Sequence, residues 1–115
     1  MAVIPDPIRK QCEEKGGLEA IISGLPESRD LKRKAKLFQA LGDPMRLKIL
    51  FALDAQPLCA CLVREILGIS DSKLSYHLTV LKDAKLIVGK KKGQWIIYDL
   101  TELGKIVLRT SEKFQ

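Results

Sequence analysis

The sequence predicts a mainly helical fold with a small β-hairpin toward its C-terminal end, and three observations lead to this class. Apolar residues recur at helical spacing over residues 28–41 and 70–83. β-forming residues then flank a basic, glycine-containing turn at residues 90–94. The 115 residues, 46% of them hydrophobic, suit one compact domain rather than a disordered chain or an enzyme with two lobes.

Residues 1–27 predict an N-terminal arm, and residues 28–115 predict the folded domain. Three prolines and the Gly16-Gly17 pair interrupt the arm and leave room for a short amphipathic helix around residues 18–23. The arm has three basic and five acidic side chains. We therefore expect the arm to lie outside the core.

Two consecutive helices open the domain. Apolar residues spaced i, i+4, i+7 and i+10 from Leu31, with Phe38 among them, predict a helix over residues 28–41 that packs by this stripe. Asp43 and Pro44 then suit the N-cap and first position of a second helix. Because residues 45–53 are apolar at seven of nine positions, this second helix is expected to be buried.

A second pair of helices follows Pro57. The first is short and ends at Gly68, which can take the left-handed conformation of a helix end. Ser70 is the expected N-cap of the second, about fourteen residues long, and the buried face of this helix consists of Leu74, Leu78 and Leu81.

The period then changes from helix to strand. Residues 86–88 and 95–100 predict the two strands of a hairpin, with Trp95 and Tyr98 packing it onto the helices. A last helix begins at about Thr101. A short helix, a glycine turn, a longer helix and a basic hairpin, in that order, are typical of a winged helix-turn-helix.

The longer helix predicts a surface that reads DNA. Opposite its leucine stripe lie hydroxyl and basic side chains suited to the major groove, and the lysines of the hairpin suit phosphates. The expected DNA-binding residues are Ser72, Lys73, Ser75, Tyr76, Thr79, Lys90, Lys91 and Lys92. The helix alone leaves open that this face is simply solvated and that the lysines serve solubility, and the order of the elements favours DNA.

Charge and targeting signals agree with this interpretation. The chain carries +6, and the segments 28–55 and 71–98 hold the excess, which favours a polyanion: nucleic acid before an anionic membrane surface. The N-terminus does not resemble a signal peptide, and no apolar run is long enough to span a membrane. We expect a cytoplasmic protein with no membrane partner.

The cysteines predict thiol or metal chemistry. Three cysteines, two of them one residue apart, make a poor disulfide framework. If Cys59 and Cys61 both lie in the first turn of the helix after Pro57, their sulfurs point about 200° apart, so shared binding of one ion would distort that turn. Thiolates select soft ions, and Cys12 on the arm could supply a third sulfur from the same chain or a partner. The alternative is that these cysteines are small core residues.

The only histidine, His77, is expected to be half-buried and bonded to a backbone group rather than to a ligand. An enzyme with a cysteine nucleophile would need His77 as its general base, on a different helix. We therefore expect no enzymatic activity.

The combined motifs resemble the ArsR/SmtB (arsenic-repressor) family of winged-helix metal-sensing repressors. The matching stretches are Leu41–Leu50, Leu58–Ser70, Ser75–Lys82 and Lys92–Tyr98, within about residues 31–100. The resemblance implies a homodimer, formed through the first and last helices of the domain, that binds a partly palindromic double-stranded operator. It also implies release by a thiophilic ion such as As(III), Cd(II) or Pb(II) at Cys59, Cys61 and Cys12, with no cofactor needed for folding.

The sequence departs from that family at four places. The arm has one cysteine where cadmium and lead sensors often use two, and Arg64 stands where arsenic sensors often have a third cysteine. Residues 101–115 contain no histidine, which excludes the family's zinc site on the last helix. Lys85 replaces a frequent glycine.

Two alternatives to metal-controlled repression remain. The same DNA-binding repressor could respond to cysteine oxidation or to a non-metal effector. A basic module that docks on a protein or a membrane would bind a short palindromic duplex no better than scrambled DNA.

Overall fold

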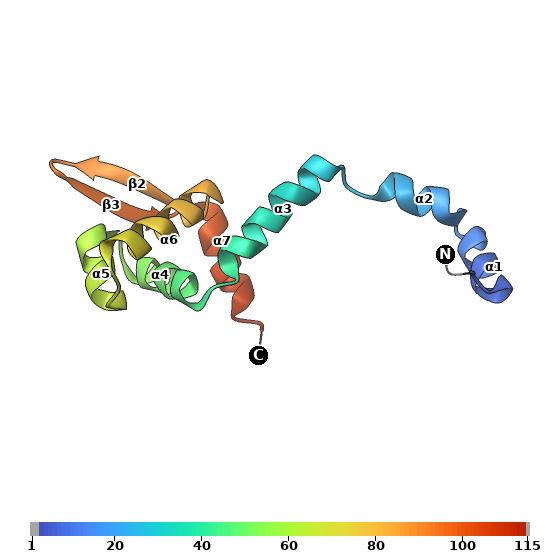
Figure 1. Ribbon diagram of the computed structural model, residues 1–115, viewed down its shortest axis with the longest axis horizontal. Coiled ribbons are helices and arrows are strands. Elements are labelled where there is room, and N and C mark those ends of the chain that lie inside the picture. The colour runs from blue at the N-terminus through green and yellow to red at the C-terminus, as the bar shows by residue number, and fades with distance from the viewer. Residues whose placement is uncertain (1–2, 115) are drawn as a thin grey trace. The chain divides into compact units, whose positions relative to one another are not determined.

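The computed structural model describes residues 3–114, which form seven helices and a three-stranded antiparallel sheet (Figure 1). The predicted class, mainly α with a small β element, is confirmed. Contacts divide the chain into two compact units, one up to Arg33 and one from Lys34 onward. The division into an arm (1–27) and a domain (28–115) stays a prediction, and its residues 1, 2 and 115 lie outside the described part. No described helix combines the length and apolarity needed to cross a bilayer.

The first unit is helical but buries little. α1 (Asp6–Glu14) has prolines at its start, where proline is tolerated, and α2 (Gly17–Gly24) follows Gly16, whose φ of 103° favours glycine. Neither helix contains a buried residue. α2 corresponds to the short helix expected around residues 18–23, whereas α1 is an addition to the sequence prediction.

α3 (Ser28–Leu41) and α4 (Pro44–Ala55) form where the sequence predicts them. Asp43 is the N-cap of α4, because its Oδ1 accepts hydrogen bonds from the backbone N–H groups of Met45 at 2.8 Å and Arg46 at 3.2 Å. The prediction that α4 is buried holds for Ile49, Leu50 and Leu53, which lie in the core, whereas Phe51 is 48% exposed.

The predicted packing of α3 is wrong in part. Leu31 and Phe38 are exposed, Phe38 at 68% of its surface, and the buried residue of this helix is Ala40. Leu37 and Leu41 pack at the edge of the core. The apolar stripe is therefore present on the helix, but most of it faces solvent.

The helix predicted directly after Pro57 begins later than expected. A two-residue strand, β1 (Leu58–Cys59), comes first, and α5 (Ala60–Leu67) follows. The reason is a tertiary pairing, since Leu58 lies opposite Tyr98 and Cys59 opposite Ile97 in an antiparallel ladder. α5 ends at Gly68 in the left-handed conformation, φ 64°, as predicted.

The hairpin consists of β2 (Ile87–Lys92) and β3 (Trp95–Leu100), and β3 is the central strand of the sheet. The three lysines belong to β2 rather than to the turn, and the hairpin tip extends beyond the helices of the second unit (Figure 1). Tyr98 is buried, as predicted. Trp95 is 53% exposed, contrary to prediction, because it pairs with Lys92 at the end of the ladder next to the turn.

α7 (Glu102–Ser111) closes the second unit. Thr101 caps it by accepting a hydrogen bond from the backbone N–H of Gly104 at 3.1 Å, and its own backbone N–H donates to the Leu86 carbonyl at 3.1 Å. Gly104 is buried against this corner, where a Cβ would collide with the Leu86 carbonyl oxygen. This close approach places Leu108 in the core.

Candidate nucleic-acid interface and thiol pair

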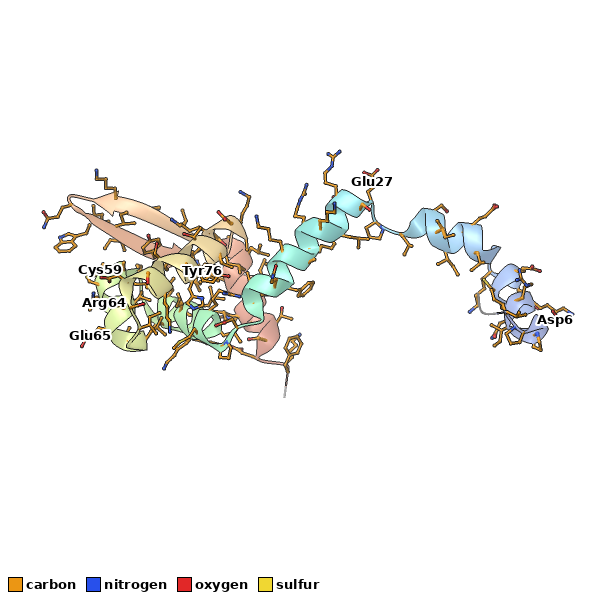
Figure 2. The ribbon with its side chains drawn as sticks, viewed as in Figure 1. Asp6, Glu27, Cys59, Arg64, Glu65 and Tyr76 are labelled. Carbon is orange, nitrogen blue, oxygen red and sulfur yellow. A yellow bond between two sulfur atoms is a disulfide. The ribbon has the colours of Figure 1, made fainter. Side chains whose placement is uncertain are left out.

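α6 (Asp71–Asp83) presents two opposite faces, as predicted. Leu74, Leu78 and Leu81 are buried and hold the helix on the core. The five predicted DNA-contacting residues of this helix are all exposed: Ser72, Lys73, Ser75, Tyr76 and Thr79. Figure 2 shows Tyr76 on this helix, and 62% of its surface is accessible. The arrangement offers hydroxyl groups and one cation to a groove or to solvent.

The start of α6 is fixed by two side chains. Ser70 Oγ accepts the backbone N–H of Lys73 at 3.3 Å, which confirms Ser70 as the N-cap. Arg64 of α5 donates to the Asp71 carboxylate at 2.8 Å, and this contact raises the pKa of Arg64. Arg64, noted in the sequence only as a missing cysteine, thus joins the two helices of the helix-turn-helix.

The hairpin brings three cations together on one strand. Lys90, Lys91 and Lys92 are exposed on β2, opposite Ile97, Ile96 and Trp95 of β3. None of these lysines has an ion-pair partner among the described residues. Three consecutive exposed lysines without carboxylate partners, which alternate between the two faces of the strand, suit a polyanion.

The thiol pair differs from its predicted geometry. Cys59 and Cys61 are joined by a disulfide, so the expectation of a poor disulfide framework is wrong for this pair. Cys59 lies before α5, as its N-cap, with ψ of 160°, rather than within the first helical turn. The extended backbone turns its sulfur toward Cys61, and the two Cα atoms are 5.4 Å apart. The sulfurs therefore converge without any distortion of the helix.

A complete metal site is not assembled within either unit. The described residues bring no three His, Cys, Asp or Glu side chains together there. Cys12, the predicted third sulfur, is a half-buried free thiol on α1 of the first unit. Reduced Cys59 and Cys61 offer two soft donors at one place, which suits a thiophilic ion but leaves its remaining coordination to a ligand from elsewhere.

His77 is half-buried, as predicted, but its partner is a side chain rather than a backbone group. Its Nδ1 lies 3.1 Å from a guanidinium nitrogen of Arg46. Arg46 also donates from Nε to the Ala40 carbonyl at 2.7 Å and from its third nitrogen to the Gln39 carbonyl at 3.1 Å. The sequence prediction missed this contact, although a lone arginine in the apolar run 45–53 was a signal for it.

Asp43 adds a negative charge beside this group. Burial opposes its ionisation, but hydrogen bonds from the Arg46 and Met45 backbone and the charge of Arg46 together hold its pKa below the ordinary value. Asp43 is thus a carboxylate at neutral pH.

Comparison with known proteins gives a consistent result. Residues 43–88 match the sequence model of the family described as bacterial regulatory protein, arsR family. The chain is 42% identical over 73 residues to the arsenical resistance operon repressor of Bacillus subtilis, covering 63% of this chain and 70% of that one. It is 36% identical over 69 residues to a homolog of the cadmium resistance regulatory protein CadC from Staphylococcus aureus, covering 59% and 57%.

Solved structures share the fold. The crystal structure of Rv0081 from Mycobacterium tuberculosis superposes with a TM-score of 0.69 at 27% identity, covering 76% of this chain and 89% of that one.

Proposed function

The chain belongs to the ArsR family of bacterial regulatory proteins and is a DNA-binding transcriptional repressor, and we propose that it releases its operator when a thiophilic ion binds Cys59 and Cys61. The observation that carries this proposal is the convergence of the two sulfurs at the start of α5, the first helix of the helix-turn-helix. Binding of an ion at the start of α5 would change the position of α6, because α5 and α6 are the two helices of one helix-turn-helix.

The same residues connect to the hairpin. Cys59 pairs with Ile97 of β3, so the thiol pair lies where the sheet meets the helix-turn-helix. Arsenite, Cd(II) or Pb(II) would bind the thiolates in place of protons. Cys12 supplies a third sulfur in this proposal, since two donors leave a trigonal ion incomplete. Relatives named for arsenical and cadmium resistance support this class of ion.

DNA contact is assigned to the exposed face of α6 and to β2. Ser72, Lys73, Ser75, Tyr76 and Thr79 enter the major groove, and Lys90, Lys91 and Lys92 contact phosphates. Their exposure supports this role, because buried or ion-paired side chains could not serve it. A palindromic operator follows if two copies present two such faces.

The second copy is proposed to cover the outer faces of α3 and α7. Apolar side chains there line an open groove of about 360 Å³, among them Phe38, Ile106 and Phe114. Those three side chains are 60–74% exposed. A homodimer would remove this apolar surface from water.

The test uses the reduced full chain under anaerobic conditions. A duplex is first selected from a random-sequence library by the protein, and its affinity is compared with that of a scrambled duplex. Arsenite, Cd(II) or Pb(II) is then titrated. We expect a 5–150-fold loss of affinity, which is the usual range of allosteric coupling.

Matched variants identify the ligands in this titration. Cys59→Ser with Cys61→Ser should abolish the response, and Cys12→Ser should weaken it. Counting the thiols that remain reactive gives the number of sulfurs bound per chain. An unchanged response in the double variant would refute the metal proposal.

The disulfide favours a second candidate, a redox switch at the same pair. Two thiols would lose two electrons and two protons to one molecule of hydrogen peroxide, forming the disulfide and two molecules of water. In metal-free buffer, peroxide should then release the selected duplex and dithiothreitol should restore binding. Cys59→Ser alone should remove this response, and retention of it would exclude the switch.

A further inference from the structure

Arg46 is a charged side chain in an otherwise apolar core. It is 7% exposed and is the one buried charged side chain among residues 3–114. Within the same residues it forms no ion pair with a carboxylate. Burial of a guanidinium costs free energy unless its N–H groups form hydrogen bonds. The groups that accept hydrogen bonds from Arg46 therefore identify the parts of the fold that it holds in place.

Two of those partners are the end of α3. The carbonyls of Gln39 and Ala40 belong to the last turn, where helical carbonyls have no partner within the helix and carry the negative end of its dipole. Arg46 lies in the first turn of α4 and satisfies both carbonyls. It therefore fixes where α3 ends relative to α4.

The third partner is the recognition helix α6. Arginine has no hydrogen-bond acceptor, so the 3.1 Å contact requires that His77 Nδ1 accept the bond. The imidazole is then neutral, with its proton on Nε2. His77 lies directly after Tyr76 and two residues before Thr79, both of which are assigned to DNA contact.

We infer that Arg46 is a positioning residue for DNA recognition, which through His77 holds the orientation of α6 against the end of α3. The inference rests on the proposed function of α6. Two of the three bonds hold Arg46 against the end of α3, and the third has a fixed direction toward His77. This third bond adds a directional restraint on the rotation of α6 to the packing of its buried leucines. Because α3 carries the proposed dimer face, the contact also connects that face with the DNA surface.

Several charged groups surround this contact. Asp43 interacts electrostatically with both Arg46 and His77. Lys36, Tyr76 and Asp83 line a small cavity that Arg46 also borders.

The test measures specificity, defined as the ratio of the dissociation constants for the scrambled and the selected duplex. His77→Leu removes the acceptor and should lower this ratio about tenfold, the size of one lost hydrogen bond to a charged group, while affinity for the scrambled duplex stays the same. His77→Asn offers an amide oxygen near the position of Nδ1 and should restore the ratio.

A double-variant cycle separates positioning from direct DNA contact by His77. Arg46→Lys keeps the charge but loses the forked geometry, and it is used because an apolar residue there could prevent folding. If the two residues act through their contact, His77→Leu causes no further loss in the Arg46→Lys background. Circular dichroism verifies that each variant is folded.

Each outcome is decisive. If the wild type selects no duplex, the proposed function fails together with the inference. If the wild type selects a duplex and His77→Leu keeps the full ratio, only the inference fails. If the losses from Arg46→Lys and His77→Leu add, the two residues act independently, and positioning of α6 through their contact is refuted.

Discussion

α3 and α4 are consecutive helices with different surroundings. Both carry apolar residues, and only two residues, Gly42 and the cap residue Asp43, separate them. α4 has most of its apolar side chains at least partly covered by the rest of the second unit, and Ile49 and Leu50 are fully buried. α3 leaves Phe38 in solvent. The core of one chain therefore forms without burying the outer face of α3, and this face stays accessible to the second copy that we propose.

The largest effect on stability is expected for the buried side chains of α4. Leu50→Ala removes a fully buried side chain from α4 and should lower the free energy of unfolding by about 2–5 kcal/mol. Urea denaturation at a fixed protein concentration measures it. Phe51→Ala, the next residue, which is 48% exposed, is the matched control and should cost far less. Equal losses would mean that Phe51 is covered by a partner.

A smaller effect, on dimer formation rather than on folding, is expected for the exposed face of α3. Phe38→Ser should raise the dimer dissociation constant at least about thirtyfold, as for a central interface aromatic residue, and leave the fold of the chain intact. Sedimentation equilibrium measures the constant. Lys36→Ser, about 200° away around α3, is expected to have little effect. A dimer unaffected by Phe38→Ser would place the second copy elsewhere.

A still smaller loss of stability is expected for a substitution at the junction between α3 and α4. Asp43→Ala removes the N-cap of α4 and should destabilise the chain by about 1 kcal/mol. Asp43→Asn keeps an acceptor oxygen and should retain most of that stability. Thermal unfolding of the two variants side by side tests this, and an equal drop for both would show that the charge matters more than the cap.

The smallest effect concerns the ion pair between α4 and α7. Arg109 donates two hydrogen bonds to Asp54, each 3.1 Å long, and these bonds hold the pKa of Asp54 below its ordinary value. A lowered carboxyl pKa contributes stability above the ordinary value of about 3.9, and this is lost as the pH falls through the folded-state pKa.

Arg109→Met should therefore lower the melting temperature slightly at pH 7, and the difference from the wild type should vanish in strong acid. Lys113→Met, which removes a positive charge from the same region without breaking this pair, is the control. A difference that persists at the lowest pH would contradict the ion-pair explanation.

Local signals explain most of what the sequence predicts correctly. The predicted caps at Asp43 and Ser70 each lie directly before the helix they start, and the leucines of α6 repeat at helical spacing. These features depend on residues within one or two turns of each other. Resemblance to the family added the expected functions of the same elements.

The missed features depend on residues far apart in the chain. β1 has two residues and no periodicity, and it exists because β3 pairs with it some forty residues later. The position of Cys59 follows from that pairing, so the sequence could not place its sulfur. The bond between Arg46 and His77 joins residues 31 apart, and only the presence of an arginine in the mostly apolar run 45–53 hints at it.

Gly104 has a consequence for how sequences with this fold can vary. It lies so close to the Leu86 carbonyl that there is room for the hydrogen atom of glycine but not for a Cβ. Leu103 and Lys105, its neighbours on α7, are both exposed. Evolution can thus alter residues 103 and 105 freely while position 104 tolerates glycine alone, so an invariant glycine between two variable positions would mark chains that dock their last helix in this way.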